Sequence, residues 1–431
     1  MVLKLNLCAS AVLLVLGLLS MPIAANESGC VSYYDSAKDY FPDKVESKYA
    51  SGFSIAYTNN AKYIRNSISG ETYVLYQCGT PAPADANPTP ASSLQVGNWT
   101  KLVAVPGTKI ALDSAPASAA IELLGAQDSV AAAYKYFEVT SPCMQQRLDA
   151  LPRIQQNFGT PSARRRRSSG SSSHLVRRVS YDLSSLGLQW TFTTYGMSDP
   201  SSIAVNPENA ADMLGKAEWI KFVAAFFNKE AEANQIFAGI ESRYNALKTS
   251  AASTAAKKTI GLARYNKVAN GTVLGWAIDQ VQPWLARGLA DAGLKAYSGD
   301  SVSFHSASDF YKAISGWDIM IDVSGEPLPH GGSTIPEWTN ISSGYGFSNG
   351  AGRDFAKSLP AVAHNSIYRS DLISSYQNAT DYNEHLQIQA DALLGDYIEI
   401  ASAASGTTSA KWYRNMPLQM PVEWMSSAGC H

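Results

Sequence analysis

The chain has 431 residues, with 34 lysines and arginines against 36 aspartates and glutamates, which gives a formal net charge of −2. This balance excludes a polycationic nucleic-acid-binding protein of the usual kind. Hydrophobic residues make up 45% of the chain and charged residues only 16%. Disorder of the whole chain is therefore excluded, and the length predicts about two to three folding units.

The first 25 residues are typical of a secretory signal peptide. Lys4 supplies a positive charge, residues 11–19 form a short apolar run, and small residues precede a cleavage point near Asn26. The alternative is an N-terminal membrane anchor. No later segment approaches the roughly 18 uninterrupted apolar residues of a membrane-spanning helix. We therefore expect a secreted or cell-surface protein with no transmembrane segment in the mature chain.

Removal of the leader leaves an even number of cysteines, namely Cys30, Cys78, Cys143 and Cys430. In an oxidising compartment these predict two disulfides, and the sequence leaves open which of the three pairings forms. A zinc site is the alternative, but no CxxC or HxxxH spacing supports it.

N-x-S/T sequons begin at Asn26 and at four further candidate glycosylation positions: Asn98, Asn270, Asn340 and Asn378. Together with a signal peptide, these sequons favour a secreted eukaryotic glycoprotein.

An α/β pattern begins after a set of short β-like runs near the N-terminus. A strand at 109–114, a helix at 116–124 that ends at Gly125, and a strand at 129–134 follow one another. This order is typical of a βαβ unit with parallel strands. Four consecutive arginines at 164–167, flanked by serine and glycine, predict an exposed insertion over about 161–180. Proprotein cleavage after Arg167 and contact with an anionic surface are functional alternatives.

A long helical segment follows. Aromatic and aliphatic residues from Trp219 to Phe227 recur at helical spacing, and Asn228 is expected to cap a second helix over 228–247. That helix would run roughly 30 Å, enough to link two lobes. The α/β pattern then resumes with a strand at 259–265, a helix at 281–292, a strand at 317–323 and a helix at 393–400.

Catalytic and cofactor motifs are lacking from the sequence. It contains no P-loop, Rossmann GxGxxG, GxSxG or HExxH pattern. The histidines are scattered singly, and each is expected to be a surface or hydrogen-bonded core residue rather than a metal ligand: His174, His305, His330, His364, His385 and His431. We therefore expect no catalytic residue, no metal site and no resident cofactor.

The ordered segments resemble the periplasmic substrate-binding proteins of the iron-siderophore and cobalamin class. The resemblance rests on 109–126, on 214–222 with 227–234, on 315–322 and on 393–400. It covers roughly residues 105–402. The N-terminal residues after the leader, the arginine run and the sequons depart from the bacterial pattern and suggest a eukaryotic secreted relative.

The resemblance implies an α/β fold of two Rossmann-like lobes joined by a single long helix. We expect a signal peptide at 1–25, an N-terminal lobe at 26–212, a linking helical segment at 213–250 and a C-terminal lobe at 251–431. It also implies a monomeric binding protein, with a membrane transporter or receptor as a further partner. A small ligand, such as a ferric siderophore, another metal chelate or a tetrapyrrole, would bind between the lobes. The long linking helix predicts only a small conformational change on binding.

Ligands of open α/β sheets bind outside the carboxyl ends of the strands, so aromatic and arginine side chains there are the expected contacts. The candidates are Tyr134, Tyr136, Arg147, Arg264, Tyr265 and Trp276. The alternative is that the aromatic residues pack the core. Two alternative functions also stay open, namely a secreted enzyme and a cell-wall or matrix protein whose pocket has been lost.

Overall fold

The structure is a computed structural model of the chain. It describes residues 29–83, 101–134, 139–151, 186–194, 201–252, 258–268, 271–327, 333–348, 353–403 and 409–430. Within these ranges, no helix has the length and apolar character needed to cross a membrane.

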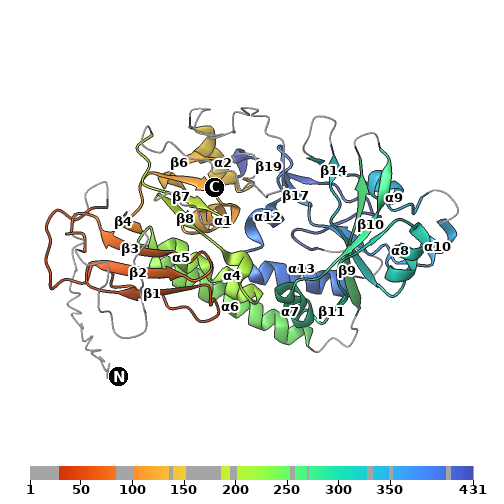
Figure 1. The fold of residues 1–431 in the computed structure, drawn as a ribbon, viewed down its shortest axis with the longest axis horizontal. Coiled ribbons are helices and arrows are strands. Elements are labelled where there is room, and N and C mark those ends of the chain that lie inside the picture. Colours follow the sequence, from red (N-terminus) through yellow and green to blue (C-terminus); the bar gives the residue numbers. More distant parts are fainter. Residues whose placement is uncertain are drawn as a thin grey trace, which may run out of the picture.

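The first sheet lies at one end of the molecule, beside the N-terminal lobe (Figure 1). Its strands are β1 (Phe53–Tyr57), β2 (Ala61–Asn66), β3 (Thr72–Gln77) and β4 (Lys101–Val105). The first three pair antiparallel, whereas β3 and β4 are parallel. Phe53 and Tyr73 contact Phe222 edge-on, so this sheet packs against the helices that lead into the linking segment.

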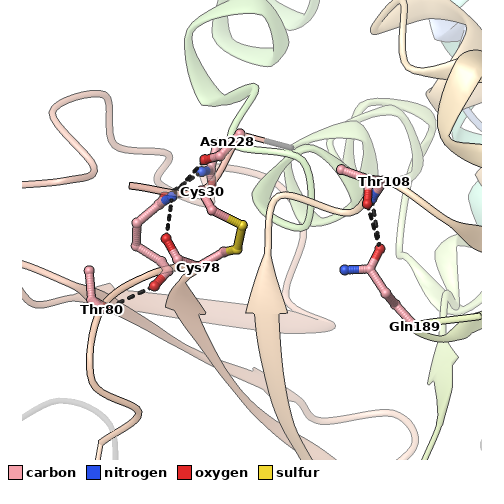
Figure 2. Close-up of a disulfide and its surroundings, with 8 residues drawn as sticks. Cys30, Cys78, Thr80, Thr108, Gln189 and Asn228 are labelled. Atoms are coloured by element: carbon pink, nitrogen blue, oxygen red, sulfur yellow. Dashed lines mark hydrogen bonds between the residues drawn. A yellow bond between two sulfur atoms is a disulfide. The ribbon is translucent and has the colours of Figure 1, made fainter. Parts of the chain in front are cut away.

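A disulfide fastens the start of the described chain to this sheet. Cys30 pairs with Cys78, just after β3, and Asn228 lies beside the bond (Figure 2). The Asn228 side chain donates to Gln77 Oε1 at 2.8 Å and accepts from Lys62 Nζ at 2.8 Å. Both interactions hold the sheet to the turn that precedes the linking helix.

The N-terminal lobe contains a four-stranded parallel sheet in the order β6-β5-β7-β8. Its strands are β5 (Ile110–Asp113), β6 (Val130–Ala133), β7 (Thr191–Thr193) and β8 (Ser202–Ala204). Helix α1 (Ala115–Leu123) begins where Ser114 Oγ accepts from the Ala117 N–H, and α2 is Pro142–Asp149. Gly125 follows α1 with a φ of 63°, which confirms the expected left-handed end of this helix.

Three helices connect the lobes, namely α4 (Met213–Ala217), α5 (Trp219–Ala225) and α6 (Glu230–Ala251). The expected long helix is confirmed, and Figure 1 shows α6 running from the N-terminal lobe towards the C-terminal lobe. The expected cap was wrong, however. Asn228 has a left-handed φ of 55° and its side chain binds the first sheet, so the N-cap lies one residue later, at Lys229, and α6 starts at Glu230.

The C-terminal lobe is built on a mixed sheet in the order β12-β10-β9-β13-β16-β18, with β11 also on β9. Its strands are β9 (Thr259–Lys267), β10 (Val273–Asp279), β11 (Lys295–Ala296), β12 (Val302–Phe304), β13 (Ile319–Asp322), β16 (Ile367–Arg369) and β18 (Arg414–Asn415). Of these, β9, β13 and β16 are parallel to one another.

Helices cover both faces of this sheet. They are α7 (Pro283–Asp291), α8 (Ala307–Ile314), α9 (Trp338–Gly344), α10 (Arg353–Lys357), α11 (Pro360–Ala363) and α13 (Ala390–Ser402). Ile319 and Ile321 belong to the core shared with α6, α7 and α13, whereas Met320 belongs to the core under α8 and α9. This alternation explains why β13 is apolar at every described position before Asp322. The α/β fold of two lobes joined by a long helix is therefore confirmed.

The last elements lie between the lobes. Strand β17 (Ile373–Ser375) pairs in parallel with β19 (Glu423–Met425), and α12 (Asp381–His385) follows β17. A short hairpin, β14 (Glu326–Pro327) with β15 (Ser333–Thr334), belongs to the C-terminal lobe. The chain ends beside the N-terminal lobe (Figure 1), where Cys430 pairs with Cys143 of α2. Of the three cysteine pairings that the sequence allows, the structure thus forms Cys30–Cys78 and Cys143–Cys430.

Candidate functional site

Helix α12 faces the carboxyl ends of the parallel strands in the N-terminal lobe. A cavity of about 20 Å³ lies at the end of β5, lined by Leu112, Asp113, Ser114, Ala115, Ser118, Ala133 and Val139. A space of this size holds about one water molecule. The cavity at the end of β5 is therefore too small by itself for a bulky ligand.

Glu384 of α12 binds to the N-terminal lobe next to this cavity, through Ser118 among other residues. This fully buried carboxylate accepts five hydrogen bonds from the N-terminal lobe. Its Oε1 accepts from the hydroxyls of Ser118 (2.7 Å) and Ser141 (3.0 Å). Its Oε2 accepts from the N–H (2.5 Å) and hydroxyl (2.6 Å) of Thr140 and from the Ser141 N–H (3.0 Å). Ser141 is the N-cap of α2, so the carboxylate also lies at the positive end of that helix.

His385 and Asp381 extend this arrangement into what we call the interlobe cluster: Asp381, Glu384 and His385 with Ser118, Thr140 and Ser141. His385 Nδ1 lies 3.0 Å from Asp381 Oδ1, and its Nε2 lies 3.2 Å from Ser141 Oγ. Asp381 Oδ2 accepts from the indole N–H of Trp412, which precedes β18, at 2.7 Å. Helix α12 therefore binds the N-terminal lobe through Glu384 and the C-terminal lobe through Asp381.

The order Ser141–His385–Asp381 has the spacing of a catalytic triad, but its protons are placed differently. In a working triad the serine hydroxyl donates to the histidine, which acts as a general base. Here the Ser141 hydroxyl donates to Glu384, and both ring nitrogens of His385 face acceptor oxygens. The contact of Nδ1 with the Asp381 carboxylate favours the protonated ring, which is a poor general base. Because Ser141 is also fully buried, the cluster acts as a structural link between the lobes.

The pKa values of the pair agree with this assignment. Burial opposes the charged form of His385, but the hydrogen bond with Asp381 and the charges of Glu384 and Asp381 outweigh burial and raise its pKa. Burial also acts against the charged form of Asp381, yet the hydrogen bond and charge of His385 hold the pKa of Asp381 well below its usual range. Lys411, 3.8 Å from Asp381, is the other cation facing the pair.

These shifts predict a pH-dependent stability. The His385 contribution is present below its ordinary pKa of about 6.5 and is lost as the pH rises through the raised pKa. The Asp381 contribution is present above about 3.9 and is lost as the pH falls through the lowered pKa. We expect the free energy of unfolding of the wild type, minus that of His385→Asn, to shrink as the pH rises above about 6.5 in urea denaturation. The exposed His364→Asn serves as the control, and a difference that stays constant with pH would contradict the assignment.

The C-terminal lobe places a second buried polar group at its own strand ends. Asp322 ends β13, Arg369 ends β16 and the two form an ion pair. Asp371 accepts from Arg369 Nε at 2.7 Å and from Arg414 Nε at 2.9 Å. Two carboxylates thus face two guanidinium groups, and the charges balance inside the lobe.

Tyr345 completes this second group by donating to Asp322 Oδ1 at 2.6 Å. Burial and the neighbouring Asp322 raise the pKa of Tyr345 well above its ordinary value, so the phenol stays protonated as a donor. The group therefore fixes the ends of β13 and β16 relative to each other.

The six predicted ligand contacts do not come together in one place. Arg147 Nε donates to the Val130 carbonyl at 2.8 Å within the N-terminal lobe. Tyr134 follows β6 and is half-buried, and Tyr136 lies outside the described residues. In the C-terminal lobe, Arg264 pairs with Asp279 and keeps 42% of its side chain exposed.

The two remaining aromatic candidates pack in the core of the C-terminal lobe. Tyr265 is 2% exposed and meets Tyr345 edge-on. Trp276 stacks on Phe310 and donates its indole N–H to the Gly344 carbonyl at 3.0 Å. Their present contacts correspond to the alternative interpretation, in which the aromatic residues pack the core.

His385 is a buried, hydrogen-bonded residue, as the sequence analysis allowed. Sequence reasoning missed its neighbours Glu384 and Asp381 between the lobes, and Arg369 and Arg414 within the C-terminal lobe. Within the described ranges, no group of three or more His, Cys, Asp or Glu side chains has an arrangement that could hold a metal ion.

Comparison with known proteins gives similarity of structure only. No family model matches the chain, and no curated protein matches it. Among solved structures, it is similar to the petrobactin-binding protein YclQ from Bacillus subtilis, with a TM-score of 0.45 and 12% identity over 70% of this chain and 94% of that one. A periplasmic binding protein from Veillonella parvula gives a TM-score of 0.44 and 10% identity over 68% and 90%. The triscatecholate siderophore binding protein FeuA from Bacillus subtilis gives 0.42 and 13% over 70% and 95%. These structures are of the kind that the sequence resembles.

Proposed function

We propose that the protein is a secreted, non-catalytic binding protein that holds a small ligand between its two lobes, beside α12. The supporting observation is the position of α12, which bonds to the strand ends of the N-terminal lobe through Glu384 and to Trp412 of the C-terminal lobe through Asp381. The crevice outside the carboxyl ends of parallel strands is where α/β sheets bind ligands. The ligand class that the resemblance implies is a ferric siderophore, another metal chelate or a tetrapyrrole.

Binding would take place without wide closure of the lobes. Helix α6, the interlobe cluster and the Cys143–Cys430 disulfide each link the two halves. Of the six predicted contacts, Tyr134, Arg147, Arg264 and Trp276 keep accessible surface in the described structure. Arg147 and Trp276 donate to backbone carbonyls of their own lobes, so we propose that Arg264, on β9, and Tyr134, directly after β6, touch the ligand. The fixed, planar guanidinium of arginine suits carboxylate and hydroxamate oxygens.

A titration with ferric desferrioxamine, ferric enterobactin and haemin tests this function. The chain has nine tryptophans, so a bound iron chelate is expected to quench their fluorescence at micromolar concentration or below. Arg264→Ala should weaken binding about tenfold, equal to the loss of about 1.4 kcal/mol. Arg243→Ala is the matched control, because Arg243 is also exposed and paired, with Asp391. A flat response to all three probes would overturn the proposed ligand class.

A second candidate function is a matrix or cell-wall protein on the same scaffold. The observation that favours it is the cavity of about 20 Å³ at the end of β5, which is too small for a chelate. Native mass spectrometry of protein purified from its source separates the two. A co-purified small molecule supports the binding protein. A chain that carries no ligand and binds none of the three probes supports the matrix or cell-wall protein.

A further inference from the structure

Two large aromatic side chains are exposed side by side on the β17–β19 pair. Tyr376 directly follows β17 and is 68% exposed, and Trp424 in β19 is 45% exposed. Their rings stack with centroids 5.4 Å apart and planes within 7°. Together they form a flat apolar surface, which we call the aromatic pair, and it faces solvent. Apolar area of this kind is usually covered by a partner or a ligand.

A tight turn places a sequon next to the aromatic pair. The Ser375 N–H donates to the Ala379 carbonyl at 2.8 Å, and the Asn378 N–H donates to the Ser375 carbonyl at 2.9 Å. Asn378 takes a left-handed φ of 65° and is exposed. It begins the sequon Asn378-Ala379-Thr380, two residues after Tyr376. The turn folds the chain back on itself two residues after Tyr376, whose ring stacks on Trp424.

We propose that Asn378 carries an N-linked glycan whose first sugar packs on the aromatic pair. A pyranose ring has an apolar C–H face and a polar rim, which matches an aromatic surface bordered by solvent. The glycan would therefore remove the exposed apolar area from water and stabilise the turn before α12. This inference rests on the secreted location in the proposed function, and it does not depend on which ligand the lobes bind.

The chain provides its own comparison at Asn340. That sequon also has an aromatic residue two positions before it, Trp338, so sequence spacing alone does not separate the two sites. Asn340 lies on helix α9, where its side chain accepts from the Glu337 N–H at 3.2 Å. Residues two apart on a helix point to different sides, and Trp338 packs against the core of the C-terminal lobe. Trp338 would therefore not lie beside a sugar on Asn340.

The test uses the full chain secreted from eukaryotic cells. Enzymatic glycan release in ¹⁸O-water with peptide mass spectrometry is expected to show Asn378 modified in most molecules. Asn378→Gln should lower Tm by about 2 °C or more. Asn340→Gln also removes the contact with the Glu337 N–H, and its Tm change should be the same with and without Tyr376. In a Tyr376→Ala background the Asn378→Gln effect should fall to less than half, and Tyr376→Phe should restore it.

The possible failures are distinguishable. Glycans at other sequons with none at Asn378 would overturn this inference and leave the secreted location intact. An Asn378→Gln effect of equal size with and without Tyr376 would overturn the contact with the aromatic pair. A chain with no glycan at any sequon would overturn both the inference and the secreted location.

Discussion

Glu384→Ala is expected to lower the free energy of unfolding by about 3 to 5 kcal/mol. The change removes a carboxylate that accepts five hydrogen bonds, and it leaves the N–H groups of Thr140 and Ser141 buried without an acceptor. It also leaves His385 with one anionic partner instead of two. Chemical denaturation followed by both circular dichroism and tryptophan fluorescence gives the measurement, because two probes show whether the lobes unfold together.

Two variants control this prediction. Glu399→Ala removes an exposed glutamate of α13 that binds only a surface serine in the described structure, and we expect a change under about 0.5 kcal/mol. Glu384→Gln keeps the side-chain length and one acceptor oxygen, so its loss should lie between the other two. If Glu384→Ala and Glu399→Ala cause equal losses, the interlobe cluster does not hold the lobes together.

Sequence patterns predicted the elements whose signals are local. The first βαβ unit was confirmed because Ser114 and Pro116 mark the start of α1 and Gly125 its end, all within twelve residues. The N-cap of α6 was placed one residue too early for a reason that is not local. Asn228 has the right chemistry for an N-cap, but its side chain binds Lys62 and Gln77 of the first sheet instead.

The interlobe cluster could not be predicted in the same way. Helix α12 has five residues, too few for a periodic apolar pattern, and Glu384 meets Thr140 across 244 positions of the chain. Ser141-Pro142 is a recognisable helix start, but the neighbouring sequence does not indicate which acidic residue will contact it. Arg264 was chosen because it neighbours an aromatic residue on a strand, whereas the structure buries Arg369 and Arg414 at strand ends through pairing with aspartates from other segments.

Removal of the Cys143–Cys430 disulfide should cost more stability than removal of Cys30–Cys78. The first bond closes a separation of 287 residues and the second one of 48. In the chain-entropy description this ratio alone gives a difference of about 1.6 kcal/mol, within native-disulfide contributions of about 2 to 5 kcal/mol. The double variants Cys143→Ser/Cys430→Ser and Cys30→Ser/Cys78→Ser are compared by urea denaturation. A larger loss from Cys30→Ser/Cys78→Ser would contradict the prediction.

The Cys143→Ser/Cys430→Ser variant also tests the contact between the two lobes. Cys143 and Ser141 lie at the start of the same helix, so the disulfide and Glu384 hold the same contact between α2 and the C-terminal part of the chain. The stability losses caused by Glu384→Ala and by removal of the Cys143–Cys430 disulfide should therefore not add, because neighbouring links share one interface.

The effect of the Cys143–Cys430 disulfide on ligand affinity is a separate prediction. If binding needs no lobe movement, the affinity for an iron chelate that binds the wild type should change less than about twofold when this disulfide is removed. A marked rise in affinity would instead show that the disulfide holds the lobes away from a closed, ligand-bound state.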